Sequence, residues 1–199
     1  METIRGKTSL EMTAAELKET LGGYEHILLD LGTGDGRFVC HMAKQHPDQF
    51  FIGVDACREN LHLSSRKRRP NALFVISNVL ALPVELNGLA SHVTINFPWG
   101  SLLEGLLTEN DPLVCRLKTI TRPCARMDIH LNVEALATAG WTLESGAEQI
   151  RHILNAAGWK TKSRACMDTY LLRSFPTTWA KRLAFGRDPR AVRLSLQRG

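Results

Sequence analysis

The 199-residue chain lacks the features that mark membrane, secreted and zinc-binding proteins. No apolar run approaches the roughly 20 residues that a helix needs to cross a bilayer. The first residues, METIRGKTSLEM, contain no apolar core of an export signal. The five cysteines form no C-x-x-C pair and share no zinc-like spacing with the histidines. We therefore expect a cytoplasmic protein with reduced thiols, no membrane contact and no metal.

Acidic residues are scarce toward the C-terminus. Residues 159–199 hold 10 Lys and Arg against 2 Asp and Glu, which leaves 15 of the 25 basic and 18 of the 20 acidic residues for the first 158 positions. A basic C-terminal quarter is expected of a protein that binds a polyanion. A solvated surface explains the charge alone equally well.

Repeats and low-complexity segments are also absent, and the length fits one domain over residues 1–199. Buried-type apolar runs alternate with amphipathic stretches, which predicts an α/β fold with a mostly parallel sheet and helices on both faces. The sheet is doubly wound, has seven strands and finishes with a strand pair. Strands are expected at 26–32, 49–56, 72–77, 91–98, 125–132, 159–168 and 191–197; helices are expected at 13–23, 35–47, 57–69, 101–107, 110–120, 142–158 and 177–186. The helices at 13–23 and 142–158 begin after the capping residues Thr13 and Thr142.

The segment LLDLGTGDGRF (28–38) runs from a buried strand into Gly32, Gly34 and Gly36. Ligands of a doubly wound sheet bind at the carboxyl ends of the strands, and glycines let a ligand approach the backbone closely. Asp55 stands 21 residues after Gly34, at the end of the second predicted strand, where an acid binds the hydroxyls of a ribose. The alternative is a tight turn that binds nothing.

An acid two residues before the first glycine decides which ligand is expected. The dinucleotide pattern G-x-G-x-x-G needs glycine at 37, where this chain has Arg37. Asp30 would repel a pyrophosphate but attract the methionine ammonium of S-adenosylmethionine. The segment therefore predicts S-adenosylmethionine. Asp35 is interpreted as the N-cap of the following helix.

A second segment, INFPWG (95–100), follows the fourth predicted strand and should face the reacting methyl group. Phe97, Pro98 and Trp99 form a flat apolar wall there, as a purine flipped from its stack requires. A lone tryptophan is otherwise more often a core residue. Asn96 gives the segment a likeness to the Asn-Pro-Pro-Tyr type sequence of enzymes that methylate exocyclic amines, with Phe97 in place of the first proline.

Three segments, DLGTGDGR, NFPWGSLLE and WAKRLAFGR, together resemble the kanamycin–apramycin aminoglycoside-resistance methyltransferases. The resemblance covers about residues 24–107 and 175–190, and its last segment is the most specific. It implies a Rossmann-like class I S-adenosylmethionine-dependent methyltransferase. Such an enzyme methylates N1 of a decoding-site adenosine in 16S rRNA of the 30S subunit and confers aminoglycoside resistance. We expect a monomer with a short extension (1–23), a cofactor-binding core (24–120) and a C-terminal part (121–199) that contacts rRNA and the target base.

The resemblance also implies roles for individual residues. Trp99 and Trp179 are the catalytic pair that sandwiches the flipped adenosine; the alternative for Trp179 is packing on the sheet with Leu183. The cofactor-binding residues are Asp30, Gly32, Thr33, Gly34, Asp55, Asn78, Val79, Leu80 and Asn96. The RNA-binding residues are Arg66, Lys67, Arg68, Arg69, Thr177, Lys181, Arg182, Arg187 and Arg190. The basic run at 66–69 is otherwise a solvated helix end.

Two other functions remain open at this stage. Asn96 favours an adenine-N6 methyltransferase. Leu80, where the family usually has an acid near the cofactor adenine, and a region 121–175 shorter than usual favour an RNA-binding protein of the same fold with little turnover.

Overall fold

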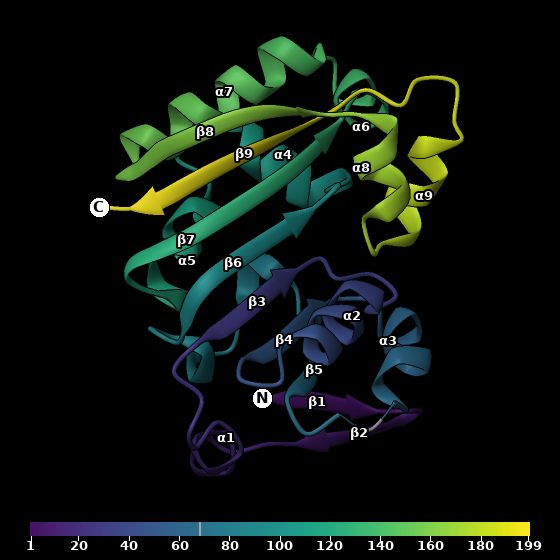
Figure 1. The fold of residues 1–199 in the computed structure, drawn as a ribbon. Coiled ribbons are helices and arrows are strands. Elements are labelled where there is room, and N and C mark those ends of the chain that lie inside the picture. The colour runs from purple at the N-terminus through teal and green to yellow at the C-terminus, as the bar shows by residue number, and fades with distance from the viewer. Residues whose placement is uncertain (68) are drawn as a thin grey trace.

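Five parallel strands in the order β5-β4-β3-β6-β7 form the centre of the sheet in the computed structural model, which describes residues 1–67 and 69–199 (Figure 1). An antiparallel pair flanks each side, β1 and β2 beside β5, and β9 and β8 beside β7. The strands are β1 Glu2–Arg5, β2 Thr8–Glu11, β3 Ile27–Leu31, β4 Phe50–Asp55, β5 Ala72–Ile76, β6 Ala90–Asn96, β7 Thr121–Asn132, β8 Trp159–Met167 and β9 Ala191–Arg198.

The fold class predicted from the sequence is confirmed, but the described residues form nine strands rather than seven. The two additional strands, β1 and β2, come from residues expected to be an extension. Each has four residues, and the outer strand β2 is mostly solvent-exposed, so neither shows the apolar run of a buried strand. Edge strands that are short and polar resist pairing with other chains. For the same reason they lack the apolar pattern by which a strand is predicted from sequence.

Helices pack in separate sets on the two faces of the sheet (Figure 1). Helices α2 and α3 cover β3, β4 and β5 on one face. Helices α1, α4, α5 and α7 cover the other face, where the larger apolar cluster lies. None of the described helices is long and apolar enough to span a membrane. The helices are α1 Ala14–Thr20, α2 Arg37–Gln45, α3 Arg58–Ser65, α4 Gly100–Leu107, α5 Pro112–Ile120, α6 Val133–Thr138, α7 Leu143–Ala156, α8 Thr169–Ser174 and α9 Thr178–Ala184, with short 3-10 turns at Val79–Ala81 and Val84–Leu86.

Helices on both faces are confirmed for the sheet as a whole, but the second face of the outer strands β7, β9 and β8 is covered only in part. Met127 and Ile129 of β7 point into the cluster beneath α7 and are fully buried. The residues that alternate with them share the other face, where Arg126, Arg193 and Lys160 are exposed. Antiparallel strands tolerate one solvated face, which strands buried on both faces do not.

The capping residues predicted for two helices are confirmed. Thr13 and Thr142 each accept a hydrogen bond from the third backbone N–H of the following helix. Two short helices, α6 and α8, were not predicted. Helix α8 packs with α9 in a third apolar cluster that includes Phe97, Leu172 and Leu183. This cluster holds α9 over the carboxyl ends of the parallel strands, beside α2 (Figure 1).

Candidate active site

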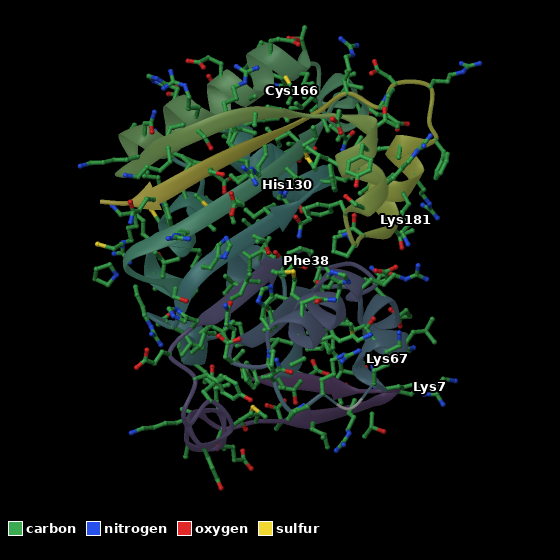
Figure 2. All side chains as sticks on the ribbon, in the orientation of Figure 1. Lys7, Phe38, Lys67, His130, Cys166 and Lys181 are labelled. Atoms are coloured by element: carbon green, nitrogen blue, oxygen red, sulfur yellow. The ribbon has the colours of Figure 1, made fainter. Side chains whose placement is uncertain are left out.

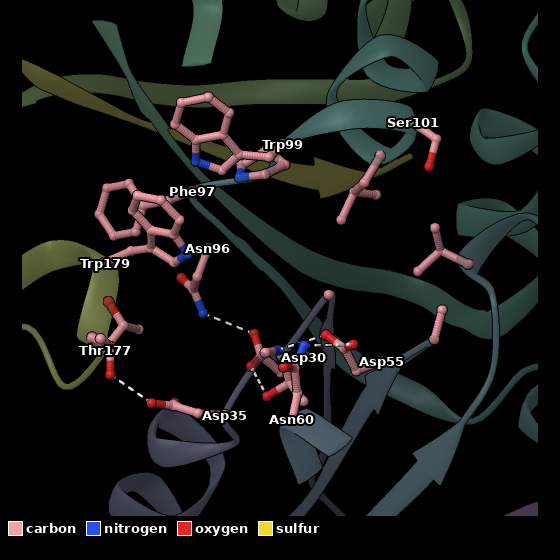
Figure 3. A pocket seen from close by; sticks show the side chains of 18 of the residues that line it. Asp30, Asp35, Asp55, Asn60, Asn96, Phe97, Trp99, Ser101, Thr177 and Trp179 are labelled. Atoms are coloured by element: carbon pink, nitrogen blue, oxygen red, sulfur yellow. Dashed lines mark hydrogen bonds between the residues drawn. The ribbon is translucent and has the colours of Figure 1, made fainter. Parts of the chain in front are cut away.

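A cavity of about 470 Å³ opens at the carboxyl ends of β3, β4, β5 and β6 (Figure 3). This is where the strand order reverses, because β4 follows β3 on one side while β6 returns to its other side. The loops after these four strands form its floor, and the first residues of α9 form its upper wall. The predicted residues that line it are Asp30, Gly32, Thr33, Gly34, Asp55, Asn78, Val79, Asn96, Trp99, Thr177, Trp179 and Arg182.

Asp30 is a buried carboxylate on the cavity floor. Thr33 Oγ1 donates to its Oδ2 at 2.5 Å, and Thr94 Oγ1 and Asn96 Nδ2 donate to its Oδ1 at 2.7 and 2.8 Å. Burial raises the pKa of Asp30 to about 6, against the effect of these three hydrogen bonds, and the charge of Asp55 adds to the rise. A carboxylate with a raised pKa on a cavity floor is typical of a functional site and is stabilised by a cationic ligand.

Asn96 presents an unsatisfied acceptor beside this carboxylate. Its amide nitrogen is committed to Asp30, and its buried Oδ1 has no partner among the described residues. An unpartnered buried carbonyl costs free energy, which a donor on a ligand would recover. The ammonium of S-adenosylmethionine offers both a positive charge for Asp30 and N–H donors for Asn96, so the residues present fit this cofactor.

The glycine loop is tied to the end of β4. The backbone N–H of Gly34 donates to Asp55 Oδ2 at 2.7 Å. Asp55 Oδ1 accepts from the backbone N–H of Cys57 at 2.9 Å and from Asn60 Nδ2 at 3.3 Å. The carboxylate is therefore held rigidly at the cavity rim, where ribose hydroxyls can donate to its remaining lone pairs. Asn60 also lines the cavity, and no sequence pattern had indicated it.

The segment after β5 lines the cavity with Ser77, Asn78 and Val79. Asn78 Oδ1 accepts from the backbone N–H of Leu80 at 2.9 Å and so caps a short 3-10 turn. Leu80 lies outside the lining and packs against the main apolar cluster. The contacts available to a ligand here therefore come from residues 77–79.

The indoles of Trp99 and Trp179 lie together above the cavity (Figure 3). Their ring centroids are 5.3 Å apart and the ring planes meet at 30°. Trp179 remains 39% exposed, so it does not pack into the sheet, although Leu183 one turn later is buried. The guanidinium carbon of Arg182 lies 5.3 Å from the centroid of Trp179.

The backbone that presents Trp99 has an unusual conformation. Phe97 has φ of 54°, its side chain is buried, and its N–H donates to the carbonyl of His130 at 2.8 Å. The Phe97 ring contacts the rings of Phe175 and His130, which offset the cost of a positive φ. Proline is fixed near −65° and cannot adopt this conformation. The turn after Asn96 therefore differs from one built on Asn-Pro-Pro-Tyr.

Two threonines fix the start of α9. Thr177 is its N-cap and accepts from the N–H of Ala180 at 3.0 Å. Thr178 Oγ1 donates to Asp35 Oδ2 at 2.5 Å and joins α9 to the glycine loop. Asp35 is not the N-cap, because Gly36 holds that position with φ of 69°, although Asp35 Oδ1 accepts from the N–H of Arg37, the first residue of α2, at 3.2 Å. Asp35 instead links two segments of the cavity.

Among the described residues, the predicted RNA-binding cations lie outside the cavity, apart from Arg182. Arg66, Lys67, Lys181 and Arg187 are exposed, and Arg69 is half-buried. Lys67 and Lys181 project toward the same side of the molecule (Figure 2). Arg190 is paired with Asp188 through contacts of 2.6 to 3.2 Å. Arg68 lies outside the described residues.

Comparison with known proteins identifies relatives that match along the whole chain. The family model NpmA, 16S rRNA (adenine(1408)-N(1))-methyltransferase, matches residues 2–198. A 16S rRNA (adenine(1408)-N(1))-methyltransferase from Escherichia coli is 30% identical over 213 aligned positions, which cover 98% of this chain and 97% of the relative. The crystal structure of the 16S rRNA methyltransferase KamB is 26% identical to this chain, with a TM-score of 0.91, and the match covers 100% of both chains. The crystal structure of the aminoglycoside resistance methyltransferase NpmB1 is 31% identical, with a TM-score of 0.81, and the match covers 100% of this chain and 99% of the NpmB1 chain.

Proposed function

This chain belongs to the NpmA family of 16S rRNA (adenine(1408)-N(1))-methyltransferases, and from this premise we propose which of its residues carry out the reaction. It is an S-adenosylmethionine-dependent enzyme that methylates N1 of an adenosine in 16S rRNA, the modification associated with aminoglycoside resistance. The observation that carries the residue roles is the stacked pair Trp99 and Trp179 directly above a cavity whose floor is Asp30.

The cavity floor is the proposed cofactor site. Asp30 and the free Oδ1 of Asn96 bind the methionine ammonium, and Gly32, Thr33 and Gly34 allow the ligand close to the backbone. Asp55 binds the ribose, and Asn78 and Val79 contact the adenine. When bound, S-adenosylmethionine supplies an electrophilic methyl group on its sulfonium.

Trp99 and Trp179 are the proposed catalytic residues, because their indoles line the cavity and offer the aromatic faces on which a flipped adenine can stack. N1 of adenosine carries a lone pair in the ring plane and no proton, so the chain needs no general base. Positioning is then most of the catalysis. Methylation leaves the purine ring positively charged, and the faces of two indoles stabilise that charge by about 1–2 kcal/mol where water is excluded.

The cations around the cavity, together with Thr177, are the proposed rRNA contacts. Arg66, Lys67 and Arg69 follow α3, and Arg68 of the same run lies outside the described residues. On the other side of the cavity the proposed contacts are Thr177, Lys181, Arg182, Arg187 and Arg190. Phosphate contacts of this kind position the protein on RNA without reading sequence. Arg190 must exchange its bond to Asp188 for one to RNA, so we expect its contribution to be the smallest.

The form in which the rRNA is bound follows from the arrangement of these cations. Cations on two sides of the cavity suit a folded RNA read by its shape, so we propose that the substrate is 16S rRNA within the 30S subunit. We also propose that the enzyme acts as a monomer in the cytoplasm, where its substrate is assembled.

An adenine-N6 specificity is less well supported by the geometry. An enzyme that methylates an exocyclic amine must hold its two hydrogens with an Asn side chain and a backbone carbonyl. Here Asn96 Oδ1 is open to such a hydrogen, but the positive φ of Phe97 excludes the proline-based turn of those enzymes. A protein of the same fold with little turnover is likewise less well supported, because the contacts proposed for the cofactor adenine use residues 77–79 and do not need Leu80.

Primer extension across the decoding site tests the proposal. The protein is expressed in a susceptible host, and its rRNA is also digested and separated by mass spectrometry. We expect a stop at a single decoding-site adenosine, N1-methyladenosine in the digest and resistance to aminoglycosides. A digest that contains N6-methyladenosine, or no new methylated nucleoside, overturns the assignment. Trp99→Ala, which leaves the cofactor floor intact, serves as the catalytically impaired control.

A further inference from the structure

The turn between β1 and β2 carries two exposed cations, Arg5 and Lys7, that have no role in the function proposed above. Two hydrogen bonds hold this turn against α3. The N–H of Gly6 donates to Ser65 Oγ at 2.9 Å, and Arg58 Nη2 donates to the carbonyl of Lys7 at 2.7 Å. Both bonds use the backbone of the turn, so the side chains of Arg5 and Lys7 stay free in solvent.

Glycine at position 6 lets the turn contact the end of α3. Its φ is +62°, and a Cβ there would lie 3.0 Å from Cγ of Arg66. This close approach brings Arg5 and Lys7 beside Arg66 and Lys67, and we call these four residues the hairpin–helix patch. All four are exposed, and none forms an ion pair with any described residue. The patch is therefore a concentrated positive charge that no acid among the described residues neutralises.

Helix α3 connects this patch to the cavity. Asn60, in its first turn, lines the cavity, and Ser65, at its end, binds the turn. An eight-residue helix is about 12 Å long, so the patch lies close enough to contact the same folded RNA as the cavity. Lys7, Lys67 and Lys181 project toward one side of the molecule (Figure 2), which places the turn on the same side as the start of α9.

The hairpin does not need these two side chains for its own stability. Its packing uses Ile4, which is buried in the apolar cluster under α3, and Thr3, which pairs with Val75 of β5. Arg5 and Lys7 are exposed, and neither belongs to an apolar cluster. Their charges are therefore available for a ligand.

We propose that Arg5 and Lys7 bind phosphates of the rRNA, so that the β1–β2 turn and the end of α3 form one phosphate-binding surface. The inference rests on the proposed function, which supplies a polyanionic substrate, and adds to it a second segment of the chain that contacts this substrate. Long flexible cations on an exposed turn suit phosphates better than base edges, so the contact contributes affinity and orientation without sequence specificity.

The double variant Arg5→Glu/Lys7→Glu tests this surface in the full-length protein. The matched control is Lys18→Glu/Lys44→Glu, which reverses two exposed charges in the last turns of α1 and α2, away from the patch. Binding to purified 30S subunits is measured at several salt concentrations, together with single-turnover methylation, S-adenosylmethionine binding by calorimetry, and thermal melting. We expect at least tenfold weaker 30S binding for the patch variant and a shallower salt dependence, by about one to two phosphate contacts. Cofactor affinity should be unchanged, and the control should behave like the unmodified protein.

Three results overturn the proposal: unchanged 30S affinity and salt dependence in the patch variant, equal losses in patch and control variants, or a loss confined to cofactor binding. A failure of the proposed function is visible separately, because the unmodified protein would then leave 30S subunits unmethylated. Should the charge reversal lower the melting temperature, Arg5→Ala/Lys7→Ala replaces it. We expect this variant to lose less 30S affinity than the charge reversal; an unchanged affinity overturns the proposal.

Discussion

The indole of Trp99 stacks on the indole of Trp179, with 5.3 Å between ring centroids and 30° between planes. The two rings come from different parts of the chain, the loop after β6 and the first turn of α9. Since they are already in contact, a purine can enter between them only if one ring moves. We expect Trp179 to move, because it is the more exposed ring and α9 is a short surface helix.

Substitutions at the two tryptophans should depend on whether an aromatic face remains. Phenylalanine keeps a stacking surface, whereas alanine removes one that contributes about 1–3 kcal/mol. We expect single-turnover methylation of 30S subunits to fall about tenfold or more in Trp179→Ala and only a few-fold in Trp179→Phe, with the same order at Trp99. Equal losses for phenylalanine and alanine would contradict the stacking role. Cofactor binding by calorimetry is the control and should stay unchanged in all four variants.

Replacing Asp30 by asparagine should separate stability from function. Its pKa is raised from 3.8 to about 6, so the carboxyl ionises at a lower pH in the unfolded chain than in the folded protein. The free energy of unfolding therefore falls as pH rises from about 4 through 6. The full cost at pH 7.5 is roughly 3 kcal/mol. The neutral amide of the variant keeps an acceptor for Thr94 and gains a donor for Thr33. We expect Asp30→Asn to be about 1–3 kcal/mol more stable in urea at pH 7.5 and to lose S-adenosylmethionine binding at least a hundredfold.

The control for this variant is Asp48→Asn, which removes an exposed acid in the turn after α2 and should change neither quantity. A destabilised Asp30→Asn protein would show that the three hydrogen bonds outweigh the burial of the charge.

Cofactor affinity should depend on pH through the same carboxyl. Below pH 6 a protonated Asp30 must release its proton before it can pair with the ammonium, because the pKa is about 6 in the free protein. We expect the affinity for S-adenosylmethionine to fall up to about tenfold per pH unit below 6 and to level off above 7. Calorimetry in buffers of different ionisation enthalpy should show proton release at pH 5.5. Methylthioadenosine, which lacks the amino-acid group, should bind with little pH dependence over this range.

The hydrogen bond from Thr178 to Asp35 should position Trp179 without contributing to the chemistry. It joins the residue next to Trp179 to the glycine loop, at 2.5 Å. A hydrogen bond to a charged group contributes about 1.5–3 kcal/mol. We expect Thr178→Val to raise KM for 30S subunits about tenfold with a smaller change in kcat, while cofactor affinity changes less than threefold. Thr178→Ser keeps the hydroxyl and should restore KM; if serine fails to rescue, the hydroxyl is not the cause.

Local patterns in the sequence were sufficient to predict the parallel core and several residues that line the floor of the cavity. Apart from Asp30, the run from Ile27 to Leu31 is apolar because β3 is buried on both faces, and the glycines follow because the loop turns with positive φ. The acids Asp30 and Asp55 stand at fixed offsets from these glycines, since both close the same end of adjacent strands. Strand alternation and capping residues are local properties, so they can be interpreted before the chain is folded.

Tertiary structure decided everything that joins segments far apart in the chain. Several such features have no periodic pattern in the sequence. They are the edge strands β1 and β2, the open face of β7, β9 and β8, the bond from Thr178 to Asp35 and the docking of Gly6 on Ser65. A resemblance pairs Trp99 with Trp179, but no local pattern does, and the packing of α8 and α9 over the strand ends is what brings their rings together. The physical reason is that a sequence pattern records which side of an element is buried, whereas the partner on that side is chosen by the packing of the whole chain.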